Sequence, residues 1–212
     1  MDLSELRREY MSQGLRRADL ASSPIDQFTH WFTQASQTQI LDPNAMVIAT
    51  VGRDGQPSAR NVLLKSYDPL GFVFYTNLES RKASQIEQNA KVALLFTWLP
   101  LNRQIKIEGT AERLSNTDAL KYFLSRPLES QWAAWASPQS RTISSRQMLE
   151  EKFFEIKQKF SKGQMPLPSF WGGYRIKPHK IEFWQGRENR LHDRFVYSLQ
   201  DDDQWKIERL AP

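Results

Sequence analysis

A histidine between two arginines lies near the C-terminus, in the segment Arg190-Leu191-His192-Asp193-Arg194. If this segment is an extended strand, Arg190, His192 and Arg194 share one face, because successive side chains alternate between faces. Nearby cations favour the neutral imidazole, which can accept a proton from a substrate. We therefore interpret Arg190 and His192 as candidate catalytic residues; the alternative is a structural histidine on a basic surface.

Two more basic clusters lie earlier in the chain. Arg60 and Lys65 bound a short apolar segment, and five positions apart they would face opposite sides of a regular strand. They could serve two different anions, a bulge could bring them together, or they could be the exposed ends of a strand. Arg81 and Lys82 follow Ser80 at a predicted helix start, where the helix dipole disfavours cations unless an anion binds there. This pair is either part of a phosphate site or a solvated surface pair.

A fourth cluster has the spacing of one helix face. Tyr122, Arg126 and Ser130 stand at positions i, i+4 and i+8, and together they could bind a phosphate by charge-assisted hydrogen bonds. Pro127 disfavours helical geometry at Arg126, so we expect one helix to end near Arg126 and another to begin at Pro127. The three side chains can still converge across that junction; the alternative is that they only decorate the surface.

The charge balance indicates an anionic partner. The 212-residue chain has a formal net charge of +5 at pH 7 and a pI near 9.4. Its basic residues form short clusters rather than one continuous stripe. That distribution suits small phosphate ligands better than nucleic acid, which is the alternative partner for a basic protein.

The residue types that the chain lacks exclude several kinds of chemistry. Without cysteine it has no disulfides, thiolate nucleophile or cysteine-bound iron–sulfur cluster, and its three histidines have no HExxH spacing, so we expect no metal. The longest apolar run, residues 45–51, is too short to span a bilayer, and no apolar stretch follows the first residues. We therefore expect a cytoplasmic protein without membrane segments.

The hydrophobic pattern predicts strands at both ends of the chain and helices between them. We expect strands over 45–51, 58–67, 72–76, 91–98, 104–114, 173–176, 180–185, 193–199 and 205–210, and helices over 24–37, 80–89, 116–125 and 144–162. The first three strands, joined by two tight turns, predict an antiparallel meander. The fold class is mainly β with peripheral helices around an antiparallel barrel. We expect one domain, 21–212, with an N-terminal arm, 1–20; the absence of GxGxxG and GxxxxGK[ST] motifs disfavours Rossmann and P-loop folds.

In this order, the motifs of the chain resemble the pyridoxine/pyridoxamine 5′-phosphate oxidase family. The similarity covers nearly the whole chain and lies in the segments 6–10, 14–20, 60–65, 74–77, 80–82, 166–173, 183–186, 190–194 and 205–212. The resemblance implies an antiparallel FMN-binding split β-barrel that works as a homodimer, with the flavin at the dimer interface. It also implies that neither nucleic acid nor a membrane is a partner. The rival interpretations are a split-barrel flavoprotein with another substrate, a flavin reductase, and a basic nucleic-acid-binding module.

The resemblance also implies an oxidoreductase of vitamin B6 biosynthesis and salvage. Pyridoxine 5′-phosphate or pyridoxamine 5′-phosphate would pass a hydride from C4′ to flavin N5. The alcohol would yield pyridoxal 5′-phosphate directly, the amine would yield an imine that water hydrolyses to it, and O2 would reoxidise the flavin to leave H2O2. A flavin that performs the redox step needs neither thiol nor metal from the protein. Arg16 and Arg17 have no role in this scheme; they are either a solvated pair or a second site for the product.

By the same resemblance, residues can be assigned to the two ligands. FMN would be held by Arg60, Asn61, Val62, Leu63, Leu64, Lys65, Tyr75, Thr76, Arg81, Lys82, Gln104, Gln139, Ser140, Trp184 and Arg194. The substrate phosphate would be held by Lys65, Tyr122, Arg126 and Ser130, with Arg190, Leu191 and His192 over the pyridine ring and Arg7, Arg8, Glu9 and Tyr10 closing over the pocket. Arg190 and His192 are the catalytic candidates.

Overall fold

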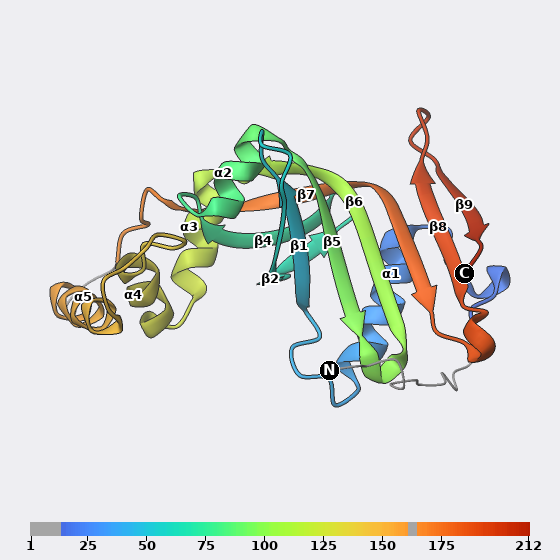
Figure 1. The fold of residues 1–212 in the computed structure, drawn as a ribbon, viewed down its shortest axis with the longest axis horizontal. Coiled ribbons are helices and arrows are strands. Elements are labelled where there is room, and N and C mark those ends of the chain that lie inside the picture. Colours follow the sequence, from blue (N-terminus) through green and yellow to red (C-terminus); the bar gives the residue numbers. More distant parts are fainter. Residues whose placement is uncertain (1–13, 161–164) are drawn as a thin grey trace.

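An antiparallel nine-stranded sheet forms the centre of the computed structural model, which describes residues 14–160 and 165–212 (Figure 1). The strands are β1 (Ala45–Val51), β2 (Pro57–Leu63), β3 (Ser66–Asp68), β4 (Gly71–Asn77), β5 (Lys91–Trp98), β6 (Arg103–Arg113), β7 (Trp171–Gln185), β8 (Asp193–Leu199) and β9 (Trp205–Leu210). The helices are α1 (Pro24–Ser36), α2 (Arg81–Gln88), α3 (Asn116–Ser125), α4 (Leu128–Ala136) and α5 (Arg146–Lys159), with 3₁₀ turns η1 (Arg17–Asp19), η2 (Leu99–Leu101) and η3 (Glu188–Arg190).

The order of the strands requires the sheet to curl into a barrel. Its main path runs β2-β1-β5-β6-β7-β4-β3, yet the two end strands, β2 and β3, are separated in sequence only by Leu64 and Lys65. Three steps of extended chain span at most about 11 Å, so the two edges of the sheet must lie close together. This confirms the predicted antiparallel barrel with peripheral helices.

The long strand β7 is where the barrel splits. One edge of β7 pairs with β6 over nearly its whole length. The other edge pairs with β4 over residues 171–176 and with β8 over residues 180–185. The β8–β9 hairpin therefore leaves the barrel and stands beside it, at the right of Figure 1, whereas α4 and α5 lie at the opposite side.

Two of the predicted strand arrangements are wrong. The expected strand 58–67 is interrupted, because the backbone N–H of Leu64 donates to Asn44 and that of Lys65 donates to Val73. As a result β4 pairs with β3 and β7, and the predicted three-stranded meander does not form. The expected strands 173–176 and 180–185 are one strand, whose Pro178 is tolerated because the register shifts opposite it, between Glu108 and Gly109.

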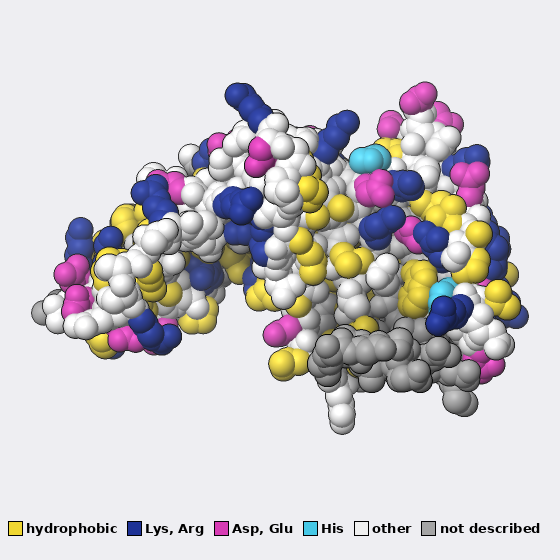
Figure 2. All heavy atoms as spheres, viewed as in Figure 1, with side chains coloured by type: hydrophobic (Ala, Val, Ile, Leu, Met, Phe, Trp, Pro, Cys, Tyr) yellow, Lys and Arg dark blue, Asp and Glu magenta, His cyan; other side chains and the backbone are white. Residues whose placement is uncertain are grey.

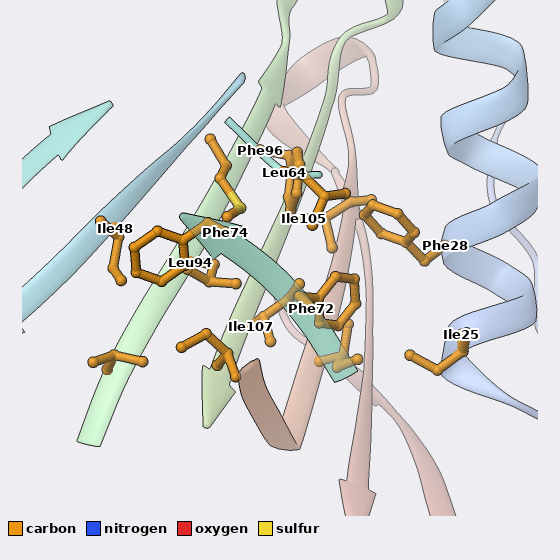
Figure 3. Packing of buried hydrophobic residues seen from close by; sticks show 14 of the residues in the cluster. Ile25, Phe28, Ile48, Leu64, Phe72, Phe74, Leu94, Phe96, Ile105 and Ile107 are labelled. Atoms are coloured by element: carbon orange, nitrogen blue, oxygen red, sulfur yellow. The ribbon is translucent and has the colours of Figure 1, made fainter. Parts of the chain in front are cut away.

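Alternate residues of the strands point into the barrel and form its core, as Figure 3 shows for Ile48, Phe74, Leu94 and Ile105. Helix α1 closes one end of this core with Phe28, whose ring meets neighbouring aromatic rings edge to face. A second, smaller hydrophobic cluster lies among α3, α4 and α5. No helix within the described ranges is long and apolar enough to cross a membrane.

Helix α1 begins where its sequence predicts. The Ser23 hydroxyl accepts hydrogen bonds from the backbone N–H groups of Ile25 and Asp26, and Pro24 occupies the first helical position. These interactions satisfy N–H groups that have no partner inside the helix. The helix is therefore held at its first turn as well as by its apolar face.

Gly71, at the β3–β4 turn, provides a test of how tightly β4 is packed against β7. Its φ is +129°, and a Cβ atom there would lie 2.1 Å from the carbonyl oxygen of Ile176. We expect Gly71→Ala to lower the free energy of unfolding by roughly 3 kcal/mol or more, because both the backbone and β7 must shift. Urea denaturation at one fixed protein concentration measures this loss.

Gly55→Ala is the matched control, since Gly55 also has a positive φ (+72°) but nothing lies within 4 Å of its Cβ position. Its cost is expected to be about 1 kcal/mol, from backbone conformation alone. Equal losses for the two variants would contradict the close contact between Gly71 and β7.

Candidate active site

A cleft of about 460 Å³ lies between the barrel and the helices that follow β6. Fourteen residues line it: Arg60, Asn61, Val62, Leu63, Lys65, Tyr75, Thr76, Lys82, Tyr122, Arg126, Pro127, Ser130, Gln139 and Trp171. The space-filling view shows the molecule hollowed between the helical lobe and the barrel, with Lys and Arg side chains gathered near this hollow (Figure 2). Most of the side chains predicted to bind the two phosphates are thus brought to one place.

The interrupted strand explains how Arg60 and Lys65 reach the same cleft. Arg60 belongs to β2, whereas Lys65 lies in the two-residue link to β3. A regular strand would have placed these residues on opposite faces. The change of direction after Leu63 brings both to the cleft, which agrees with the bulge-like alternative and not with the regular strand.

Lys82, in the first turn of α2, is buried at 8% exposure without a carboxylate partner among the described residues. Its ammonium donates to Gln139 Oε1 at 2.6 Å, Thr76 Oγ1 at 3.1 Å and Ser80 Oγ at 3.3 Å. Burial, with a smaller effect from the charge of Arg60, lowers the pKa of Lys82 to about 8. A buried cation with only neutral partners is well suited to bind an anion.

Arg60 is fixed beside this lysine by neutral acceptors. Its guanidinium donates to Thr50 Oγ1 at 2.5 Å, to Gln85 Oε1 at 3.3 Å and to the hydroxyl of Ser58. Burial, followed by the charge of Arg81, lowers its pKa. In the described part of the chain no carboxylate forms an ion pair with Arg60, Arg81 or Lys82, so their three charges repel one another until an anion binds.

The junction between α3 and α4 has the predicted form. Helix α3 ends at Ser125, Arg126 is its C-cap with extended backbone angles, and Pro127 is the N-cap of α4. Tyr122, Arg126 and Ser130 all line the cleft, so the three side chains do converge across the junction.

The guanidinium of Arg126 rests on an aromatic ring that the sequence did not single out. Its Cζ lies 4.4 Å from the ring centroid of Trp171. Its Nη1 is buried with no hydrogen-bond partner in the described part of the chain, and burial lowers its pKa. Trp171 lies within the segment 166–173 that carries the family resemblance. Spacing along the sequence could not show that its ring lies beside the guanidinium of Arg126.

A second group of predicted residues lies at the other end of the sheet. Gln104, Trp184 and Arg194 are direct neighbours across β6, β7 and β8 and therefore share one face. Arg194 donates to Glu182 Oε1 at 2.8 Å and to the carbonyl of Ala211 at 2.8 Å. Burial alone would raise the pKa of Glu182, but hydrogen bonds from Arg194 and Lys106 outweigh it and lower that pKa.

The segment 190–194 is not one extended strand, so the predicted shared face of Arg190, His192 and Arg194 is wrong. Arg190 belongs to the turn η3, with a φ of +60°, and β8 begins only at Asp193. The rings of His192 and Trp184 lie 4.6 Å apart. The backbone N–H of Arg187 donates to His192 Nδ1 at 3.1 Å, which fixes the orientation of the imidazole.

The predicted site residues therefore form two groups that one protomer does not join. Leu191 and His192 line a separate pocket beside β9, whereas the phosphate-type residues lie by β2, α2 and α3, across the molecule in Figure 1. Leu64 is buried in the barrel core, and neither Arg81 nor Ser140 lines the cleft. The predicted contacts of Arg7, Arg8, Glu9 and Tyr10 lie outside the described residues. No cluster of three His, Asp or Glu side chains suited to a metal occurs in residues 14–160 and 165–212.

Comparison with known proteins gives a consistent result. A family model described as pyridoxamine 5′-phosphate oxidase matches residues 32–160, and one described as the pyridoxine 5′-phosphate oxidase C-terminal dimerisation region matches residues 171–212. The chain is 59% identical to pyridoxine/pyridoxamine 5′-phosphate oxidase of Rippkaea orientalis over 100% of both chains. It is 60% identical to the enzyme of that name from Shewanella putrefaciens, over 100% of this chain and 99% of that one.

Solved structures resemble the described fold. PhzG from Burkholderia lata, in complex with tetrahydrophenazine-1-carboxylic acid, aligns with a TM-score of 0.88 and 30% identity over 95% of this chain and 99% of that chain. A pyridoxamine 5′-phosphate oxidase-related FMN-binding protein from Nostoc punctiforme aligns with a TM-score of 0.72 and 15% identity over 91% and 100% of the respective chains. The second likeness shows the fold alone.

The pKa of Lys82 predicts how anion binding in the cleft depends on pH. Below pH 8 the ligand-free lysine is already an ammonium. Above pH 8 it is neutral in the ligand-free protein and must take up a proton when phosphate binds. The affinity of the cofactor-free protein for phosphate should therefore fall above pH 8, by up to about tenfold per pH unit until the phosphate-bound lysine also deprotonates. Calorimetric titration with inorganic phosphate across this range measures the change.

Lys82→Met should weaken phosphate binding and remove this component of the pH dependence. Lys152→Met is the control, because it removes one positive charge from an exposed position on α5. The same pH profile in Lys82→Met as in the unaltered protein would show that Lys82 does not hold the anion.

Proposed function

The chain belongs to the pyridoxamine 5′-phosphate oxidase family, and on that premise we propose that it oxidises pyridoxine 5′-phosphate and pyridoxamine 5′-phosphate to pyridoxal 5′-phosphate. When bound, FMN would supply the redox chemistry, namely hydride acceptance from C4′ and reduction of O2 to H2O2; the amine substrate would give an imine that water hydrolyses to the aldehyde and ammonia. The protein supplies binding and orientation. The observation that carries the proposal is that Arg60 and Lys82 on one side of the cleft, and Lys65 and Arg126 on the other, line it without an ion-pair partner among the described residues.

The first group suits the phosphate of FMN. Arg60, Arg81 and Lys82 meet at the start of α2, where the helix adds its own positive dipole end. Burial of Lys82 without a counter-charge costs free energy in the free protein, and a bound phosphate would offset that cost. These residues therefore fit FMN, with Thr76 and Gln139 holding the lysine in place.

The second group suits the phosphate of the substrate. Arg126 has a buried, unpartnered Nη1 at the cleft, and Tyr122, Ser130 and Lys65 line the same cleft. Charge-assisted hydrogen bonds from such groups are each worth roughly 1.5–3 kcal/mol. A substrate held by its phosphate loses much of its freedom to rotate before reaction, which favours a narrow range of hydride-transfer angles.

The residues proposed to act on the pyridine ring come from the other half of a homodimer. The match of residues 171–212 to a dimerisation region supports a homodimer. We infer that the cleft of one protomer is completed by Trp184, Arg190, His192 and Arg194 of the other, with FMN at the interface. Support comes from the separate linings of the two pockets and from the position of β8 and β9 on the side of the molecule opposite α3 and α4 (Figure 1). The arm 1–20 would close over the completed site.

Arg190 and His192 have different proposed tasks. The planar guanidinium of Arg190 can stack on the pyridine ring and hold it against the flavin. His192 accepts a hydrogen bond at Nδ1 from the backbone N–H of Arg187, so the neutral ring carries its hydrogen on Nε2. We propose that His192 donates a hydrogen bond from this Nε2–H to the substrate, in place of the proton-accepting role expected from sequence, and that the hydroxyl proton of the alcohol substrate passes to water.

Anaerobic mixing of the FMN-loaded protein with pyridoxine 5′-phosphate tests the function directly. We expect the flavin absorption to bleach, and pyridoxine at the same concentration to react far more slowly because it lacks the phosphate. A flavin that stays oxidised with both phosphorylated substrates would contradict the proposed activity.

Two substitutions of His192 separate donor from acceptor within the same experiment. Glutamine keeps an N–H donor near the position of Nε2 but cannot take up a proton, whereas alanine removes both functions. We expect His192→Gln to retain most of the flavin reduction rate that His192→Ala loses. Equal losses in the two variants would support proton acceptance and contradict the donor role. Arg53→Ala, at the exposed β1–β2 turn, is the control for substitution as such.

A further inference from the structure

The guanidinium of Arg126 is held in a different way from those of the arginines that form ion pairs. Arg175 pairs with Asp68, Arg194 with Glu182 at 2.8 Å, and other arginines pair with carboxylates near them. In the described part of the chain Arg126 has no ion pair at all. What holds its charged group is the indole of Trp171, 4.4 Å from Cζ, with the ring of Phe123 farther away at 5.9 Å.

An aromatic support has a consequence that a carboxylate would not have. A carboxylate would cancel the charge of Arg126 and would have to give up its hydrogen bonds when a phosphate arrives. An indole attracts the cation through its quadrupole and leaves the positive charge and the N–H donors available. The buried, unpartnered Nη1 of Arg126 is the donor that this arrangement leaves for an incoming oxygen.

Only the side chain of Arg126 depends on this support, because its backbone is already fixed. Its N–H donates to the carbonyl of Phe123, and its carbonyl accepts from Gln131 Nε2 at 2.8 Å. The side chain beyond Cβ still has several rotatable bonds, which cost free energy to order if they move freely before binding. Stacking on a fixed ring removes much of that freedom in advance.

The ring of Trp171 is itself well fixed. Trp171 is the first residue of β7, where it pairs with Asn77, and its backbone N–H donates to the carbonyl of Pro168 at 2.9 Å. Its indole also meets the ring of Phe123 at 6.0 Å and 61°. The indole of Trp171 therefore keeps a fixed position relative to the sheet that lines the cleft.

We propose that Trp171 is a positioning residue for the phosphate monoester of the substrate. It holds the Arg126 guanidinium against the wall of the cleft with its charge uncompensated, so that binding the phosphate breaks no ion pair. This inference rests on the proposed role of Arg126 in the substrate site. Trp171 acts through Arg126 and takes no part in the hydride transfer.

A double-mutant cycle on the FMN-loaded dimer tests the inference. The affinity for pyridoxal 5′-phosphate and the KM for pyridoxine 5′-phosphate would be measured for Trp171→Leu, Arg126→Ala and the double variant. Loss of a desolvated cation–π contact should weaken binding by roughly five- to thirtyfold in Trp171→Leu, with KM rising by far more than kcat falls. In the Arg126→Ala background the same substitution should have almost no further effect.

Trp171→Phe and Trp135→Leu are the comparison variants. Phenylalanine keeps a smaller ring for stacking, so Trp171→Phe should lose less affinity than Trp171→Leu and serves if the leucine variant does not fold. Trp135 packs in the same helical lobe without lining the cleft, so Trp135→Leu should leave the affinity nearly unchanged.

The possible results distinguish this inference from the function on which it rests. If Arg126→Ala weakens binding but the Trp171 variants do not, or if Trp171→Leu has its full effect in the Arg126→Ala background, the inference is overturned and the proposed function stands. An equal loss of affinity in Trp135→Leu would also overturn the inference, since it would show that the effect comes from general destabilisation of the helical lobe. If Arg126→Ala itself leaves the affinity unchanged, the proposed phosphate site fails.

Discussion

The two-residue link Leu64-Lys65 joins strands that lie at opposite ends of the sheet path, and the closed shape of the barrel depends on it. Because β2 and β3 cannot separate, the sheet must curl, and its curled interior becomes the core. The same link interrupts the strand that carries Arg60 and places Lys65 at the same cleft. One local break in a strand therefore closes the fold and assembles the cationic side of the site.

The residues that line the cleft include Arg60, Lys65, Lys82 and Arg126 but no Asp or Glu. Lys82 is buried beside neutral hydroxyls and an amide, and half-buried Arg126 rests on an indole with its Nη1 buried; burial lowers the pKa of each. Such an arrangement is unfavourable in the free protein and becomes favourable when an anion binds, so part of the folding free energy is converted into affinity for phosphate. In the proposed function, the phosphates of the flavin cofactor and of the substrate would occupy two such places in one cleft.

Local signals in the sequence were sufficient for most elements and insufficient for their pairing. Ser23-Pro24, Ser80 and Pro127 mark helix boundaries through their own backbone chemistry, so these boundaries were predictable. The partner of β4 was not, because it depends on the break at Leu64 and on β7, about a hundred residues away. Arg190 was placed in a strand because alternation says nothing about a turn with positive φ, and Trp171 was missed because stacking is a relation in space. Residues 190–194 and the cleft could be linked only through family resemblance.

The central claim is that each active site is shared between two protomers, and a hybrid dimer tests it most directly. Protomers carrying Arg126→Ala and Arg190→Ala, each with a different purification tag, would be co-expressed and the mixed dimer isolated. If the site is shared, one site of the hybrid carries both substitutions and the other carries none, so its activity at low substrate should be about half that of the unaltered dimer. Activity as low as that of the two single-variant homodimers would contradict a shared site and place Arg126 and Arg190 of one protomer in the same site.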